Sequence, residues 1–202
     1  MFIIYKVYIY LMYRIKLFEE FDYDINNLKI KLNKFSIPID TWGTGKSKTI
    51  NHLLDELSNN ECELLEIDGS LVRIIEFVGV KIYYNSKDER WFLKEDRQEF
   101  NDGRIRRRTM PSSVSEKMKF GEDPLNAAIR GIKEELGIDI KSTQISKRRD
   151  LFYNGGSLSY PGLQTKYKGH QYICELEPHQ FDENGYVEVQ KDKKTFFNWE
   201  KI

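Results

Sequence analysis

The stretch EKMKFGEDPLNAAIRGIKEELGI, residues 116–138, contains a helix with well-marked ends and a pair of adjacent glutamates. Asp123 is a favourable N-cap, and Pro124 suits the first helical position, where its missing N–H costs nothing. Gly137 stands where helices commonly end in a left-handed residue. Together these signals predict a helix over residues 124–136.

This helix has an apolar stripe and an acidic edge. At 3.6 residues per turn its aliphatic side chains share one face, which we expect to be buried against a sheet while Lys133 stays exposed. Glu134, Glu135 and Gly131 share another edge. Carboxylates beside small residues suit a hard divalent cation, and their crowding should raise one carboxyl pKa until a cation binds. The aliphatic stripe consists of Leu125, Ile129, Ile132 and Leu136.

The same stretch resembles the signature of the Nudix hydrolase family, G-x5-E-x7-R-E-U-x-E-E-x-G-U, in which U is aliphatic. Two positions differ, because Glu116 replaces the opening glycine and Gly131 replaces the glutamate after the arginine. In the family that glutamate is a metal ligand or the base that activates water. The matching residues are Glu122, Arg130, Ile132, Glu134, Glu135, Gly137 and Ile138.

The resemblance implies an α+β fold, a Nudix-like α/β/α sandwich with a mixed β-sheet. It assigns residues 66–202 to this domain and leaves residues 1–65 as an N-terminal extension or appended helical unit. The implied activity is hydrolysis of a pyrophosphate bond in a nucleoside diphosphate linked to another moiety. That chemistry depends on a divalent metal, Mg²⁺ or Mn²⁺.

The resemblance also implies roles for individual residues. Glu134 and Glu135 would hold the metal, with Glu134 also counted among the catalytic residues. Arg130 would orient the glutamates by ion pairing, and Glu122 would support the site. The base is unassigned, and the side chain of Glu116 is a candidate substitute acid. Members of the family often take a further acidic ligand from a later helix, for which the candidate replacements are Glu175, Glu177 and Glu188.

The glycine at position 131 leaves a second hypothesis open. A glycine inside a helix costs about 1 kcal/mol relative to alanine, so Gly131 indicates either relaxed selection on this edge or close backbone packing. Under relaxed selection the chain is a non-catalytic Nudix-like module that binds nucleotide, RNA or a protein partner. An activity screen over diphosphate substrates would separate the two hypotheses.

A third hypothesis concerns GTGKS at residues 43–47, which is similar to part of a phosphate-binding loop. The full loop motif is G-x4-G-K-[ST], and Asp40 stands where its first glycine belongs. The segment therefore favours a polar turn that leads into a helix over residues 48–58.

Strand patterns surround the predicted helix. Apolar residues alternate over 71–84, a second strand is predicted at 91–100, and Asn101-Asp102-Gly103 is typical of a tight turn before RIRRR at 104–108. Further strands are expected near 144–152, 165–176 and 194–202.

Two segments are candidates for substrate contacts. On a strand, Arg104, Arg106 and Arg108 would point to one side, where they either clamp a polyphosphate or form a solvated sheet edge. The loop at 153–162 is either a plain connector or a substrate wall, in which Tyr153 or Tyr160 stacks on a base.

The amino-acid composition limits the kinds of partner and the cell compartment that we expect for this protein. Lys plus Arg equals Asp plus Glu, 32 each, so net charge does not indicate nucleic acid, although a local nucleic-acid site stays open. Two cysteines provide no disulfide framework, which favours a reducing, cytoplasmic compartment. Charges at Lys6, Arg14 and Lys16 interrupt the apolar N-terminus, so no transmembrane segment is expected. The oligomeric state stays open.

Overall fold

The computed structural model describes residues 24–202, so the expectation for the N-terminal apolar stretch lies outside the described residues. Within them, no helix is long and apolar enough to cross a membrane. The described helices are α2 (Ile25–Lys34), α3 (Ile50–Ser58) and α4 (Pro124–Leu136), with short 3₁₀ turns at Ile39–Thr41, Ser142–Gln144 and Pro178–Gln180.

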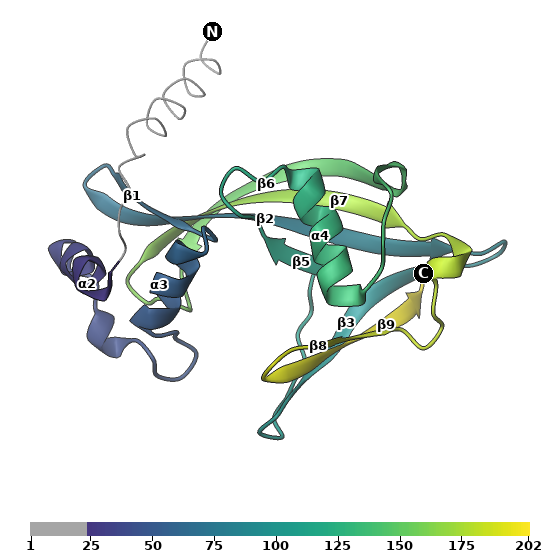
Figure 1. Cartoon of the computed structure of the whole chain (residues 1–202), viewed down its shortest axis with the longest axis horizontal. Coiled ribbons are helices and arrows are strands. Elements are labelled where there is room, and N and C mark those ends of the chain that lie inside the picture. Colours follow the sequence, from purple (N-terminus) through teal and green to yellow (C-terminus); the bar gives the residue numbers. More distant parts are fainter. Residues whose placement is uncertain (1–23) are drawn as a thin grey trace, which may run out of the picture.

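The described strands form one mixed sheet of nine strands (Figure 1). Its main path runs β6-β7-β2-β3-β9-β8, while β1 and β5 pair with β2 and β4 pairs with β3. β2 and β7 are parallel, and the other pairs are antiparallel. The expected α+β class with a mixed sheet is therefore confirmed. The strands are β1 (Glu63–Ile67), β2 (Ser70–Asn85), β3 (Arg90–Phe100), β4 (Ile105–Arg106), β5 (Val114–Lys117), β6 (Ile145–Gly156), β7 (Gln164–Glu175), β8 (Tyr186–Val189) and β9 (Lys193–Lys201).

The long strand β2 is the centre of the sheet. Its alternating residues Val78, Val80 and Ile82 are fully buried and face α4 in the main core cluster, as the period-two pattern predicts. Two strand predictions need correction. The arginine run forms only the two-residue strand β4, and β6 continues to Gly156 through the first four residues of the expected loop at 153–162.

Helix α4 has the predicted ends and the predicted phase. The Asp123 carboxylate accepts hydrogen bonds from the backbone N–H groups of two first-turn residues, and Gly137 adopts φ 72°. Ile132 and Leu136 are buried, Lys133 is exposed, and the remaining stripe residues are half-buried against the same core. Figure 1 shows α4 lying across the strands, and it contacts β2, β5 and β8.

Ile132→Ala tests this packing. The side chain is fully buried in the main core, so its truncation removes apolar burial and leaves a cavity. We expect a loss of about 2 to 4 kcal/mol in the free energy of unfolding, measured by urea denaturation. The control Lys133→Ala lies on the exposed side of the same helix and should change stability by no more than about 0.5 kcal/mol. Equal effects of both substitutions would contradict the assigned phase.

The N-terminal helices share a second core with the sheet, and β1 itself spans the expected boundary at residue 65. Figure 1 shows α2 and α3 gathered at the end of the sheet near β1. The turn at residues 43–47 closes on itself, since the Thr44 N–H donates to Ser47 Oγ, and a 3₁₀ turn precedes it. The expected polar turn before the helix is thus confirmed. This second core contains Leu28, Leu32, Leu53, Leu57, Leu64, Leu71, Ile75, Tyr160 and Leu163.

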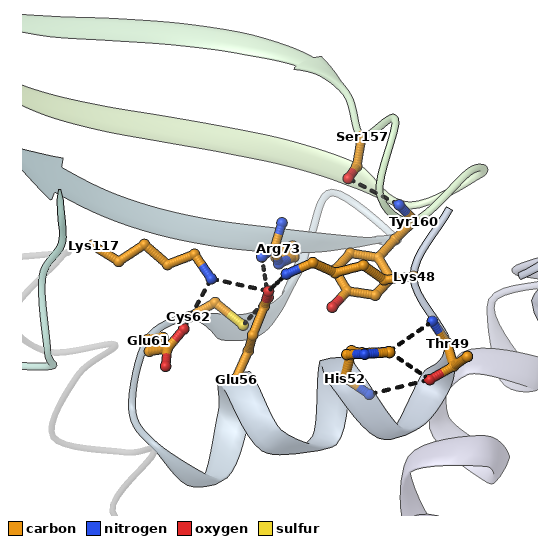
Figure 2. Close-up of polar contacts among 10 residues, drawn as sticks. All are labelled: Lys48, Thr49, His52, Glu56, Glu61, Cys62, Arg73, Lys117, Ser157 and Tyr160. Carbon is orange, nitrogen blue, oxygen red and sulfur yellow. Dashed lines mark hydrogen bonds and ion pairs between the residues drawn. The ribbon is translucent and has the colours of Figure 1, made fainter. Parts of the chain in front are cut away.

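A buried ion network joins the helical unit to the sheet (Figure 2). Glu56 on α3 pairs with Arg73 on β2, and their side chains are only 6% and 4% exposed. Lys48 and Lys117 also donate to Glu56, over 2.7 and 2.9 Å. Burial alone would raise the Glu56 pKa, but Arg73 and the two lysines outweigh it and lower that pKa to about 2. Lys117 on β5 additionally bonds Glu61, so the network reaches the strand beside α4.

Candidate active site

A cavity of about 160 Å³ lies beside α4, and four structural elements each contribute a carboxylate to its lining. Glu95 comes from β3, Glu116 from β5, Glu135 from α4 and Glu188 from β8. They converge because α4 packs directly on β5 and β8. Two cationic residues, Arg108 and Lys193, line the same cavity.

The pKa of Glu135 is raised by its position in this cavity. Burial raises its pKa to about 8, and the charges of Glu188, Glu116 and Glu95 push in the same direction, against a backbone hydrogen bond from Ser115. The pKa at the acidic edge of the helix is thus raised in the expected direction, but burial is its main cause and the neighbouring Glu134 is not one of the charges that raise it. A cation beside Glu135 would remove this electrostatic cost.

Two buried oxygens complete the inner side of the cavity. Gln98 and Thr195 lie opposite each other on β3 and β9, and each is 2% exposed. Within the described part of the chain, Gln98 Oε1 and Thr195 Oγ1 have no hydrogen-bond partner. A buried polar atom without a partner costs about 1 to 3 kcal/mol, so a polar ligand in the cavity would relieve that cost. Carboxylate, amide and hydroxyl oxygens are the donors that suit Mg²⁺ or Mn²⁺. In residues 24–202, however, no group of three or more His, Cys, Asp or Glu side chains is already placed to hold a metal ion.

Arg130 connects the glutamates on the acidic edge. Its Nε and Nη2 donate to Glu122 over 2.8 and 3.0 Å, and its Nη1 donates to Glu116 over 3.2 Å and to Glu134 over 3.0 Å. The bonds to Glu122 and Glu116 raise the Arg130 pKa, and hydrogen bonds from Arg130 lower the Glu122 pKa. Glu134 is exposed and turned to Arg130, whereas Glu135 lines the cavity. The contacts match the orienting role expected of Arg130, and that role stays a prediction.

The arginine run is divided by the structure. Arg108 donates to both carboxylate oxygens of Glu95 and lines the acidic cavity. It also lines a larger open cavity of about 500 Å³, together with Arg107 and Trp199. Arg104 pairs with the turn residue Asp102, Arg106 is exposed on β4, and neither lines these two cavities. Of the three expected arginines, only Arg108 reaches the site.

Tyr160 does not lie in a substrate wall. Its side chain is fully buried in the second core, with the Trp42 ring centroid 5.1 Å away and the Arg73 guanidinium 4.8 Å from its ring. The expected stacking of Tyr160 on a base is therefore wrong, because no face of the ring is free. Tyr153 is exposed and stacks on Tyr167 of β7. Half-buried Trp199 is the aromatic residue that lines the open cavity.

Among the three candidate acids in the C-terminal part, Glu188 lines the cavity. Glu175 instead pairs with Arg90, and Glu177 pairs with Lys141. No specific sequence signal points to Glu95, Gln98 or Thr195, which lie in ordinary strand patterns. A β-bulge in β3 between residues 95 and 97 shifts the register, and only this irregularity brings Glu95 and Gln98 to the same side.

No protein-family model matches the chain, and no curated protein sequence matches it. Among solved structures, it is similar to a C. elegans Ap4A hydrolase, with 19% identity, a TM-score of 0.34 and coverage of 63% of this chain and 79% of that one. It is also similar to the E. coli dihydroneopterin triphosphate pyrophosphohydrolase, with 20% identity, a TM-score of 0.39 and coverage of 61% and 78%. A third similar structure is the NUDIX domain of Shewanella oneidensis NrtR complexed with ADP ribose, with 8% identity, a TM-score of 0.39 and coverage of 62% and 71%.

Proposed function

We propose that this chain is a divalent-metal-dependent hydrolase that cleaves a pyrophosphate bond in a nucleoside diphosphate linked to another moiety. The activity is the one that the resemblance of residues 116–138 implies. The observation that carries the proposal is the gathering of four glutamates and two unpartnered oxygens around one cavity beside that helix. A cavity with this lining suits a cation together with a phosphorylated ligand.

The proposal divides the metal site between two adjacent glutamates. Glu135 inside the cavity and Glu134 at the edge of the helix would hold Mg²⁺ or Mn²⁺. When bound, such an ion neutralises diphosphate charge and lowers the pKa of an attacking water. Arg130 holds Glu134 in place over 3.0 Å, and Glu122 in turn fixes the guanidinium of Arg130.

The substrate would be held by cationic side chains. Arg108 and Lys193 line the acidic cavity and can donate charge-assisted hydrogen bonds to phosphate oxygens. The open cavity shares Glu95 and Arg108 with the acidic one, so one ligand can extend between them. In the open cavity, the half-buried ring of Trp199 provides an apolar surface for the rest of the substrate.

A panel assay tests this function. The full chain is incubated with nucleoside diphosphate sugars, dinucleoside polyphosphates, ADP-ribose and nucleoside triphosphates, each with Mg²⁺, with Mn²⁺ and with EDTA. We expect hydrolysis of at least one substrate that depends on the metal and yields products cut at a pyrophosphate bond. If no substrate of the panel is hydrolysed with either metal, the catalytic proposal is overturned.

A second candidate function is nucleotide or RNA binding without hydrolysis. The observation in its favour is that, within the described residues, no group of three or more His, Cys, Asp or Glu side chains is already arranged to hold a metal. Titration of the same nucleotides and of a short RNA would show saturable binding that EDTA does not affect. Binding of that kind, combined with silence in the panel assay, would establish the non-catalytic function.

A further inference from the structure

The two departures from the family signature, Glu116 and Gly131, lie in contact with each other. A Cβ atom added to Gly131 would meet the Glu116 Cβ at 2.9 Å and the Val114 Cγ1 at 3.3 Å. A separation of 2.9 Å is shorter than two carbon atoms tolerate without contact strain, since their optimal distance is about 3.5 to 4.0 Å. The close approach of α4 to β5 therefore leaves no room for a side chain at position 131 while position 116 carries one, and removing the Glu116 side chain would relieve the shorter of these two contacts.

Strand geometry directs the Glu116 side chain to this contact. Residues 114 and 116 share one face of β5, and they pair with Val80 and Val78 of β2, which are buried beneath α4. Glu116 consequently faces the helix, whereas Lys117 points to the other side and bonds Glu56. Its carboxylate reaches the edge of the helix from the strand.

The surroundings of the Glu116 carboxylate are those of the proposed site. It lines the same cavity as Glu135, and Arg130 Nη1 donates to it over 3.2 Å. The same guanidinium nitrogen donates to Glu134. Arg130 thus holds Glu116 together with the glutamates that it is expected to orient. Independently of these carboxylates, the buried Gln98 and Thr195 oxygens in this cavity have no partner within the described residues.

We infer that Glu116 supplies, from strand β5, the metal-binding carboxylate that helix α4 lacks at position 131. The inference rests on the proposed function, because it completes the same site. The apparent loss of an acid is then an exchange of an acid and a glycine between two touching positions. On this assignment the site keeps its carboxylate, and Gly131 is required by packing.

A reciprocal exchange tests the inference by Mn²⁺ titration calorimetry and thermal unfolding of the full chain. Glu116→Gln preserves the shape of the side chain and should weaken Mn²⁺ binding about tenfold or more, since even outer-shell partners of a metal contribute about 10- to 100-fold. Gly131→Glu alone should lower the melting temperature because of the contact with Glu116. The double variant Glu116→Gly with Gly131→Glu should recover both the melting temperature and Mn²⁺ affinity to within a few fold. Glu116→Gly alone is the matched control, because it removes the acid without replacing it.

The outcomes separate the inference from the proposed function. The inference is overturned if Glu116→Gln binds Mn²⁺ as tightly as the parent, or if the double variant binds no better than Glu116→Gly. If the inference is overturned in this way but Glu135→Gln abolishes Mn²⁺ binding in the same experiment, the proposed function still stands. If neither Glu116→Gln nor Glu135→Gln changes Mn²⁺ affinity, both the inference and the proposed metal site fail.

Discussion

Glu135→Gln is expected to abolish measurable Mn²⁺ binding and to lower metal-dependent hydrolysis by roughly a hundredfold or more. A catalytic metal contributes several kcal/mol of charge stabilisation in the transition state, and each 1.36 kcal/mol corresponds to a factor of ten in rate. Glutamine has nearly the same size as glutamate, but its amide cannot supply the negative charge that a bound cation requires. Calorimetric titration with Mn²⁺ and the most active substrate of the panel provide the two measurements.

Asp139→Asn is the matched control for this experiment. Asp139 lies just beyond the same helix end, pairs with Lys133, and has a side chain that is 86% exposed. The same acid-to-amide change there should leave both Mn²⁺ affinity and activity as in the parent. Unchanged Mn²⁺ affinity in Glu135→Gln would refute the metal role of this residue.

Glu135→Gln should also stabilise the metal-free protein. Because the native pKa of about 8 lies above the ordinary value of 4.5, ionisation is disfavoured in the folded state. The native protein therefore loses stability as the pH rises from about 4.5 through 8, and glutamine removes that loss. At pH 8 without metal, the variant should melt at a higher temperature than the parent. Added Mn²⁺ should raise the melting temperature of the parent only. A lower melting temperature in the metal-free variant would show that Glu135 instead has a structural role.

The second large effect is expected from Glu56→Gln, which should reduce the free energy of unfolding by about 3 to 5 kcal/mol. The substitution leaves the buried guanidinium of Arg73 without its anionic partner, and an uncompensated buried charge is costly. It also removes the carboxylate shared by Lys48 and Lys117. Urea denaturation measures the loss, and a change below about 1 kcal/mol would contradict the role assigned to this network.

The exposed pair of Glu66 with Lys34 offers a control for this prediction. Their side chains are 55% and 66% exposed, so Glu66→Gln should cost no more than about 1 kcal/mol. The double variant Glu56→Leu with Arg73→Met should be more stable than Glu56→Gln, because it removes the stranded charge. If the double variant is as unstable as Glu56→Gln, the loss of stability arises from altered packing and not from the unpaired charge of Arg73.

Acid provides a separate test of the same network. The folded pKa of Glu56, about 2, lies below its ordinary value of 4.5. The stability that ionised Glu56 contributes is therefore present above about pH 4.5 and is lost as the pH falls towards 2. Between these pH values, the stability of the parent should fall more steeply than that of Glu56→Gln. Parallel pH profiles for the two proteins would contradict the depressed pKa.

Signals from neighbouring residues predicted the helices and strands of regular geometry. Features that depend on tertiary contacts could not be predicted in this way. Asp123, Pro124 and Gly137 sufficed to place α4, because capping depends on neighbouring residues in the chain. The burial of Tyr160 depends on helices more than 100 residues earlier, and no neighbouring residue signals it. The bulge in β3 that turns Glu95 and Gln98 to one side likewise has no marker such as glycine.

The candidate site was predicted in part for the same reason. Helical spacing placed Glu135 on an acidic edge, the resemblance to the family signature pointed to Arg130, and Glu188 was one of three open candidates. Arg108 was expected to face a phosphate with two other arginines, but the strand that would align them is only two residues long. Outside that strand, Arg104, Arg107 and Arg108 pair with Asp102, Asp96 and Glu95, respectively.

The contact between position 131 and Glu116 has a consequence for how such a site can evolve. If one position always carries the acid and the other the glycine, single replacements pass through a protein that is either crowded or short of a carboxylate. The two positions should then change together in a lineage, as a pair under mutual constraint. A signature that scores each position separately counts two losses at this site, whereas the inferred exchange between the helix and its neighbouring strand counts as one coupled change.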